Sequence, residues 1–113
     1  MAFSTAYGNE ILNSISDYTM SLHTADPGGS GTNGEISGGG YARQTASFGT
    51  STAKTNTNTN TVTFSSLNAA TISYATLWVA SVAKYTAPLS TPFTVAAGES
   101  IQFSPGDLTQ ILT

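Results

Sequence analysis

The side chains that could carry out catalysis are few and lie far apart in the sequence. The chain of 113 residues has one histidine, His23, six Asp and Glu residues, three Lys and Arg residues and no cysteine. Acyl transfer requires a nucleophile, a base and an acid that orients the base, yet no serine lies in a Gly-x-Ser-x-Gly motif. Glycoside hydrolysis requires two carboxyl groups across a sugar, whereas the six acids occur singly. We therefore expect a protein that is not an enzyme and needs no cofactor.

The run from His23 to Gln44 holds most of the polar groups that could bind a ligand. Asp26, Asn33 and Glu35 offer oxygen ligands for calcium, but the ligand spacing of known calcium loops is absent, so turn chemistry is the favoured interpretation. Arg43 is the only arginine. We expect its guanidinium to form a bidentate ion pair with Glu35 or Asp26 that fixes the loop. Contact between Arg43 and a partner is the alternative.

Imidazole and aromatic side chains suggest two further roles. His23 has no second His or Cys with which to share a metal ion, so we expect it on the polar face of a strand, solvated or hydrogen-bonded. Tyrosine rings could form a carbohydrate-binding face with Asn and Thr as hydrogen-bonding partners, although packing within the sheet is the simpler interpretation. The tyrosines concerned are Tyr18, Tyr41, Tyr74 and Tyr85.

Composition favours association with other protein over binding to nucleic acid or membrane. Charged residues make up only 8% of the chain and the formal net charge is -3, so copies repel one another weakly. The three cations are scattered and form no basic stripe for phosphates. No apolar run reaches the roughly 18 residues of a membrane span, and the N-terminal residues show no basic leader or signal-peptide pattern. We expect an oligomer or assembly component that is made and used without secretion.

A helix is the first element expected to position these residues. Apolar side chains recur at intervals of three and four, which predicts an N-terminal helical arm over residues 1–15, capped by Ser4 or Thr5. The arm would pack on the chain's own sheet or, alternatively, on a neighbouring subunit. Its apolar positions are Phe3, Tyr7, Ile11, Leu12 and Ile15.

Alternating and continuous apolar runs predict roughly seven or eight strands after the helix. Trp78 lies inside the longest apolar run and is expected to anchor the core. Lys84, Tyr85 and Pro88 are expected to end that strand, and Pro88 and Pro92 should keep their segment at a sheet edge. The expected strands cover residues 18–24, 41–48, 62–64, 72–82, 92–95, 101–103 and 108–112.

Two segments between the strands are expected to be loops. Residues 25–40 form a Gly-rich loop. Residues 54–61 are a Thr/Asn-rich run without an apolar side chain, for which a mobile outer loop is favoured over a polar edge strand. The predicted fold is mainly β, a single domain over residues 1–113 built as an antiparallel β-sandwich or jelly-roll-like domain with a short N-terminal helix.

Two sequence patterns resemble a known family. A strand that ends in Thr24-Ala25-Asp26-Pro27-Gly28 is followed by Glu35-Ile-Ser-Gly-Gly-Gly-Tyr-Ala-Arg-Gln44, and the chain closes with Leu89-Ser-Thr-Pro-Phe-Thr-Val-Ala-Ala-Gly-Glu-Ser-Ile-Gln-Phe103. This combination is similar to a family of small tailed-bacteriophage virion proteins often labelled phage tail fibre proteins. The resemblance implies a structural part of a virion, assembled in the host cytoplasm.

Two hypotheses differ in where this protein is located in the virion. The chain lacks the coiled coil, collagen-like repeat or β-helix that gives a fibre its length. The favoured function is therefore a capsid cement or decoration protein that bridges subunits at the head surface, and the alternative is a tail fibre or tail-tip component for host attachment.

Both hypotheses imply symmetric homo-oligomers and contact with other virion proteins, of which the major capsid protein is favoured; a host surface glycan is a partner only under the alternative. The assembly interface is expected to use Phe3, Tyr7, Ile11, Ile15, Gly39, Tyr41 and Arg43.

Overall fold

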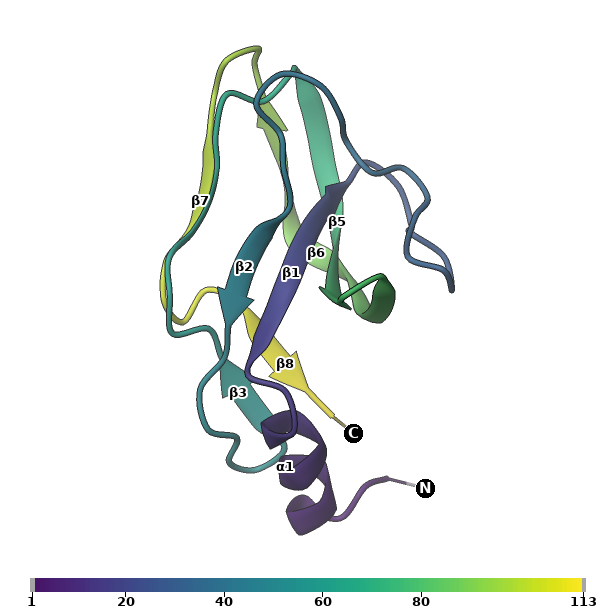
Figure 1. The fold of residues 1–113 in the computed structure, drawn as a ribbon, viewed down its shortest axis with the longest axis vertical. Coiled ribbons are helices and arrows are strands. Elements are labelled where there is room, and N and C mark those ends of the chain that lie inside the picture. Colours follow the sequence, from purple (N-terminus) through teal and green to yellow (C-terminus); the bar gives the residue numbers. More distant parts are fainter. Residues whose placement is uncertain (1, 113) are drawn as a thin grey trace.

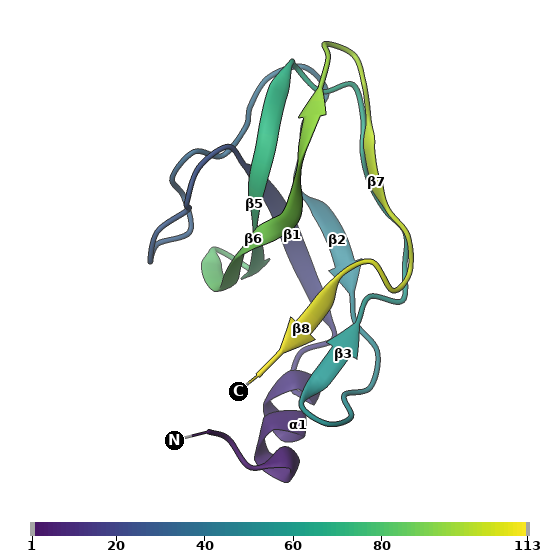
Figure 2. The same ribbon diagram turned by 180° about the vertical axis from the view of Figure 1, so that it is seen from behind.

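The computed structural model describes residues 2–112, and strands dominate it (Figures 1 and 2). One short helix precedes eight strands, which pair in antiparallel fashion. The predicted fold class, mainly β with seven or eight antiparallel strands after a short helix, is confirmed. In chain order the elements are α1 (Thr5–Asn13), β1 (Asp17–His23), β2 (Gln44–Ser47), β3 (Thr55–Thr57), β4 (Val62–Phe64), β5 (Ala70–Val79), β6 (Val82–Val95), β7 (Ile101–Phe103) and β8 (Thr109–Ile111).

The main layer is a four-stranded sheet with the strand order β2-β1-β5-β6. Its inner strand β1 alternates as the sequence predicts, because Tyr18, Met20 and Leu22 face the core and are at most 2% exposed. Met20 lies opposite Gln44 of β2 on one side and Leu77 of β5 on the other. A slip of one residue would turn the apolar row away from the core, so this row specifies the register of the sheet.

The run predicted as one strand over residues 72–82, ended by Lys84, Tyr85 and Pro88, belongs to two strands in the structure. β5 ends at Val79, and β6 then runs through Pro88 and Pro92 to Val95. The prediction that Lys84, Tyr85 and Pro88 end a strand is therefore wrong. Because β6 is the outermost strand of the sheet, a proline can leave its missing N–H on the side that has no partner strand. The related prediction, that both prolines lie at a sheet edge, is confirmed.

The second layer is a ribbon of two strand pairs, β4 with β7 and β3 with β8. Asn58 joins the two pairs. Its Nδ2 donates to the carbonyls of Asn60 (2.8 Å) and Ser104 (3.0 Å), and its Oδ1 accepts from the N–H groups of Gly106 (3.0 Å) and Leu108 (2.8 Å). This one amide therefore holds the ribbon together where regular strand pairing is interrupted.

The Thr/Asn-rich run is thus part of the fold, and the prediction of a mobile loop over residues 54–61 is wrong. Asn56 and Asn58 are only 4% and 2% exposed. Asn60 lies along β2, where its side chain accepts from the N–H of Ser47 (2.9 Å) and donates to the carbonyl of Thr45 (2.9 Å). Side-chain amides here reproduce the donor and acceptor pattern of a strand, which explains how a run without apolar residues becomes ordered.

These bonds close one side of the two-layer structure and leave the other side open. Beside β2, the N–H of Thr59 donates to the carbonyl of Ser47 (2.8 Å). Beside β6, no main-chain hydrogen bond within residues 2–112 joins that strand to β7 or β8. The core is therefore sealed at the β2 side and accessible at the β6 side. The core residues are Tyr18, Met20, Leu22, Ala46, Phe48, Val62, Phe64, Leu67, Ile72, Val95, Ile101 and Phe103.

Helix α1 is shorter than the predicted arm and packs on its own chain. Ser4 caps it as predicted, with its Oγ accepting from the N–H of Tyr7 at 3.2 Å. Leu12 is fully buried, and Oδ1 of Asn9 accepts from the N–H of Lys54 at 2.8 Å. The helix therefore depends on tertiary contacts with β3 and the segment before it. No helix among residues 2–112 has the length and apolar character needed to cross a membrane.

Candidate assembly surfaces

The Gly-rich loop is pinned to the main sheet by the ion pair that the sequence predicts. Nη2 and Nε of Arg43 donate to the two carboxylate oxygens of Glu35 at 2.8 and 3.0 Å. The hydroxyl of Tyr41 also donates to this carboxylate, at 2.6 Å, and accepts from the N–H of Leu22 in β1 at 3.2 Å. The bidentate contact between Arg43 and Glu35 is therefore confirmed, and Tyr41 connects it to the sheet. We call Glu35, Tyr41 and Arg43 the loop clamp.

The electrostatics of the loop clamp favour a charged pair beside a neutral phenol. Hydrogen bonds from Arg43 lower the pKa of Glu35; burial opposes them, and the hydrogen bond from Tyr41 adds to the lowering. Burial and then the hydrogen bond to Glu35 raise the pKa of the Tyr41 hydroxyl above its usual value. These shifts favour the charged carboxylate of Glu35 and the neutral hydroxyl of Tyr41, which are the states that their mutual hydrogen bond requires.

A buried polar layer lies beneath the loop, on the second face of the main sheet. Nδ1 of His23 is 2.8 Å from the carbonyl oxygen of Asn33, and its Nε2 is 2.7 Å from Oγ of Ser21. Since a carbonyl oxygen only accepts, we assign the proton to Nδ1, so that Nε2 accepts from the Ser21 hydroxyl. Nε1 of Trp78 then donates to Oγ of Ser21 at 2.8 Å. Every polar side-chain atom of Ser21, His23 and Trp78 is paired.

This pair of Ser21 and His23 is sealed from solvent, unlike a catalytic dyad. Both residues are fully buried, and the partner of Nδ1 is a carbonyl rather than the carboxylate that orients a catalytic histidine. The expectation of a hydrogen-bonded His23 is confirmed, whereas its solvated alternative is wrong because the loop covers this face. Trp78 is buried as predicted, but it lies beneath the loop rather than in the main core cluster. The guanidinium of Arg43 lies 4.1 Å from the centroid of its ring, which is a cation–π contact.

Close approach of the loop to the sheet depends on two glycines. Gly31 has a φ of +75°, and a Cβ there would lie 2.6 Å from the Cβ of Ala83. Gly39 has a φ of +57°, and its Cβ would lie 2.6 Å from the carbonyl oxygen of Ser66. Larger residues would clash at both positions. Gly39, which was predicted to lie in an assembly interface, thus lies against its own chain.

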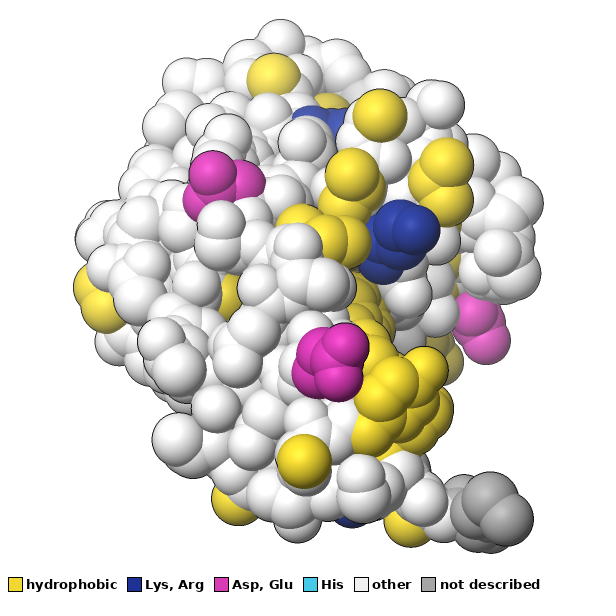
Figure 3. All heavy atoms as spheres, turned by 60° about the horizontal axis from the view of Figure 1, so that its bottom comes forward, with side chains coloured by type: hydrophobic (Ala, Val, Ile, Leu, Met, Phe, Trp, Pro, Cys, Tyr) yellow, Lys and Arg dark blue, Asp and Glu magenta, His cyan; other side chains and the backbone are white. Residues whose placement is uncertain are grey.

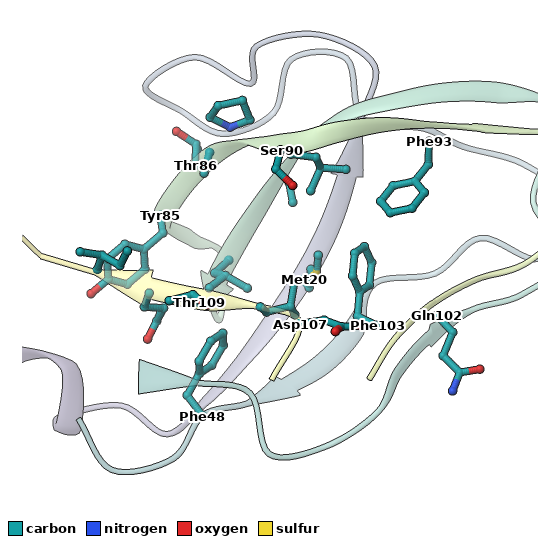
Figure 4. A pocket seen from close by; sticks show the side chains of 18 residues that line it. Met20, Phe48, Tyr85, Thr86, Ser90, Phe93, Gln102, Phe103, Asp107 and Thr109 are labelled. Carbon is teal, nitrogen blue, oxygen red and sulfur yellow. The ribbon is translucent and has the colours of Figure 1, made fainter. Parts of the chain in front are cut away.

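An apolar groove opens at the side of the molecule beside β6, with a volume of about 690 Å³ (Figure 4). Strands β5 and β6 form one wall, and β7, β8 and the residues just before β8 form the other. Phe93 of β6 points toward Phe103 of β7, with the ring centroids 5.9 Å apart. Phe93 and Ile111 are 42% and 64% exposed. A space-filling view shows hydrophobic side chains gathered along a furrow in a mostly uncharged surface (Figure 3).

The groove is almost free of charge. Among residues 2–112, Asp107 is the only charged residue that lines it, and its carboxylate accepts from the N–H of Ser104 at 2.8 Å. Tyr85 is half-buried in the wall with its ring edge against Tyr18, and burial raises the pKa of Tyr85 to about 12. An apolar occupant would therefore displace little bound water from charged groups.

One polar side chain in the lining has no partner. Gln110 of β8 is 5% exposed, and within residues 2–112 neither its Nε2 nor its Oε1 makes a hydrogen bond. Asn56, directly opposite in β3, likewise leaves its Oδ1 without a partner. A buried polar group without a partner costs about 1–3 kcal/mol. The unpaired amide atoms of Gln110 are thus enclosed within the fold, directly across the ribbon from Asn56.

A second exposed apolar feature lies at the N-terminal end of the chain. Phe3 and Tyr7 are 40% and 53% exposed, and their ring centroids are 5.7 Å apart. Ile11 and Ile15 are half-buried, and Ile15 packs against the core. Of the seven predicted interface residues, Phe3 and Tyr7 therefore form the exposed apolar pair, while Gly39, Tyr41 and Arg43 belong to the loop and its clamp.

Sequence reasoning did not find the groove. Its walls come from strands distant in the chain, and residues such as Leu77, Phe93 and Leu108 show only ordinary strand patterns. No local pattern separates a side chain that faces a sealed core from one that faces an opening. Gln110 is a weak exception, because a glutamine at an inward position of an apolar strand is unusual.

The tyrosine face considered for carbohydrate binding is not assembled, and Tyr18 and Tyr41 pack within the fold, as the simpler interpretation expects. Tyr18 is 2% exposed, so its ring is closed to a sugar, and the ring of Tyr41 stacks on Phe64 at an interplanar angle of 13°. Tyr74 and Tyr85 are half-buried. Among the residues that the structure describes, no group of three or more His, Asp or Glu side chains is arranged to hold a metal ion.

These features define a class: a small antiparallel β module with a weakly charged surface and two apolar features suited to protein contact. A family model described as Podophage GP4 fiber I protein gp80 matches residues 2–110, and the chain belongs to this family. The match supports the predicted resemblance to phage fibre proteins and implies a structural component of the virion. No curated protein matches the chain.

Proposed function

We propose that this chain is a non-enzymatic structural component of a phage tail fibre, in which copies pack against one another and against other fibre proteins. The observation that carries the proposal is the family match over residues 2–110, because the description of that family names a fibre protein. The open groove beside β6 supports it, since an exposed apolar surface with a polar rim is typical of a protein contact site.

A fibre role for this chain requires assembly with other molecules. The longest extent of the protein is 44 Å and the other two are 26 Å, so it serves as one module of a longer structure. With 8% charged residues and a net charge of -3, stacked copies repel one another only weakly. The low charge thus fits a module that is repeated or inserted in a fibre.

Sequence features alone favoured capsid cement. The family description supports the fibre role instead. The two roles make similar demands on contact surfaces, but they differ in copy number and position. A cement protein occupies sites all over the head, whereas a fibre protein is present in few copies at the tail.

Quantitative mass spectrometry of purified virions, combined with immunogold labelling of the same particles, tests this proposal. We expect far fewer copies of this chain than of the major shell protein, and label at the tail. Near-equal abundance with label over the head would replace the fibre role with capsid cement. Absence from the particle would contradict any virion role.

A further inference from the structure

We infer that Asn33, in the Gly-rich loop, is a site of spontaneous deamidation that the closed loop holds in check. Asn33 is exposed to water, and Asn33-Gly34 is the only Asn-Gly pair in the sequence. The conversion takes place when the loop lifts from the main sheet, and its product keeps the loop from closing as before. The inference concerns the chain itself and does not depend on its place in the virion.

The reaction needs only these two residues and water. The main-chain nitrogen of Gly34 loses its proton and attacks Cγ of Asn33. The new N–Cγ bond closes a succinimide ring while the Cγ–Nδ2 bond breaks, and Nδ2 leaves as ammonia with that proton. Water then opens the ring at either carbonyl, which gives aspartate or isoaspartate. Glycine favours the attack because no Cβ shields its nitrogen, whereas every other asparagine of the chain precedes a residue with a side chain.

In the closed loop, three hydrogen bonds restrain Asn33. Its N–H donates to the carbonyl of Pro27 (3.1 Å), its carbonyl accepts from Nδ1 of His23 (2.8 Å), and its Nδ2 donates to the carbonyl of Asp26 (3.0 Å). Ring closure carries Cγ onto the nitrogen of Gly34, which takes Nδ2 away from Asp26. The closed loop therefore slows the reaction, because these bonds restrain the torsion angles that ring closure has to change.

The bond to His23 ties this restraint to the buried polar layer. His23 is fully buried, and its Nε2 accepts from the hydroxyl of Ser21, so the donor that holds Asn33 is itself fixed in the sheet. Gly31 lies close to Ala83 on the same side of the loop. Release of Asn33 thus requires a local opening that lifts the loop off this layer, and local openings of this kind occur in native proteins far more often than global unfolding.

Conversion changes the loop permanently. An aspartate at position 33 has no donor for the carbonyl of Asp26, and it adds a negative charge beside this residue, whose own carboxylate accepts from the N–H of Gly28 at 3.0 Å. Isoaspartate also places one more carbon in the main chain, which displaces the carbonyl that His23 binds. Each product therefore weakens the contacts that hold the loop on the sheet.

Peptide mass spectrometry of the full chain, stored at mildly alkaline pH in native buffer and in concentrated urea, tests the inference. In urea we expect Asn33 to lose ammonia and then gain water, with aspartate and isoaspartate as products. In native buffer the reaction should be slower by at least about tenfold, since only the opened fraction reacts. Equal rates in the two buffers would overturn the role of the closed loop. A chain that stays unconverted at Asn33 in urea would overturn the site itself.

Variants that loosen the loop test its control over the reaction. Gly31→Ala disturbs the close approach to Ala83, and Glu35→Gln weakens the loop clamp. For each variant, the rate in native buffer is divided by its own rate in urea, which cancels intrinsic reactivity. This ratio should rise several-fold in both variants. Gly29→Ala is the matched control, because a Cβ there meets nothing within 4 Å, and its ratio should equal that of the wild type. Unchanged ratios in variants whose loop amides exchange faster would contradict the inference.

Asn33→Asp reproduces the aspartate product and tests its effect. We expect a lower urea midpoint and faster hydrogen exchange over residues 27–40 than in the wild type, because the carbonyl of Asp26 loses its donor. Asn9→Asp is the matched control. The contacts of Asn9 with Ser51 and Lys54 both use Oδ1, which a carboxylate retains, so exchange in the loop should equal that of the wild type. Wild-type exchange in Asn33→Asp would overturn the proposed effect of conversion on the loop.

Discussion

Asn58 is the residue on which the polar half of the molecule depends most. Its buried amide makes four hydrogen bonds, and the groups at Ser104, Gly106 and Leu108 lie on the opposite side of the ribbon. Asn58→Ala would leave several of these groups without partners, and we expect the free energy of unfolding to fall by about 3–4 kcal/mol. Urea denaturation measures this change.

The control for Asn58 is its neighbour Thr57, which is exposed in β3. Thr57→Ala should alter the free energy of unfolding by no more than about 0.5 kcal/mol. Equal effects of the two substitutions would show that the Asn58 amide adds nothing specific to the ribbon.

Glu35 gives the loop clamp a defined dependence on pH. Because hydrogen bonds from Arg43 lower the pKa of Glu35 in the folded state below its ordinary value of 4.5, the folded state binds fewer protons than the unfolded state. The stabilisation is therefore present above about pH 4.5 and is lost as the pH falls through the lowered value. We expect Glu35→Gln to be less stable than the wild type by about 1–2 kcal/mol at pH 7, with the difference disappearing in acid.

Urea denaturation of both proteins between neutral and acidic pH checks this expectation. A difference in unfolding free energy that stays constant down to pH values well below 4.5 would show that the Glu35 carboxylate charge is not the source of the stabilisation.

The contacts of a residue were easier to predict when its partners lie close to it in the sequence. Glu35 and Arg43 are eight residues apart and Arg43 is the only arginine, so their pairing was predictable. The partners of Asn58 lie up to 50 residues away, and nothing in a Thr/Asn repeat distinguishes one amide from the next. The roles of Asn58 and Gln110 therefore became visible only in the folded chain.

At the scale of elements, the Gly-rich loop acts as a cover for the second face of the main sheet. Gly31 allows the loop to approach the start of β6, where a Cβ would lie 2.6 Å from that of Ala83. Gly31→Ala should lower the free energy of unfolding by about 1–3 kcal/mol. It should also speed hydrogen exchange of amides in residues 27–40.

Gly29 in the same loop provides the comparison. A Cβ there meets nothing within 4 Å, so Gly29→Ala should be neutral within about 0.5 kcal/mol. Exchange rates that rise equally in both variants would mean that the loop is loosened by any added side chain rather than by the contact at Gly31.

Elements with one apolar and one polar face were the predictable ones. β1 alternates over Tyr18, Met20 and Leu22, and the sequence located it to within one residue at either end. The length of β6 was missed because proline ends an inner strand but not an edge strand, and edge position depends on the whole sheet. β3 lies in a run whose lack of apolar side chains predicts a mobile loop, because side-chain amides rather than apolar contacts order it.

For the whole molecule, the consequence of this topology is an asymmetric core. Residues 58–60 seal the space between the layers beside β2. On the opposite side, beside β6, Phe93 and Ile111 are 42% and 64% exposed. A second layer made of a short ribbon is too narrow to cover a four-stranded sheet. Association is the simplest way to cover the remaining apolar surface.

Salt dependence distinguishes this kind of association from one driven by ion pairs. Among residues 2–112, Asp107 is the only charged residue that lines the groove, and each copy carries a net charge of -3. Added salt screens the weak repulsion between copies and has no attractive ion pair to weaken. The dissociation constant measured by sedimentation should therefore stay constant or fall as NaCl is raised from about 0.05 to about 1 M, and sodium sulfate should lower it further. A tenfold weakening in NaCl would instead assign the contact to charged residues such as Lys84 or Glu10, outside the groove.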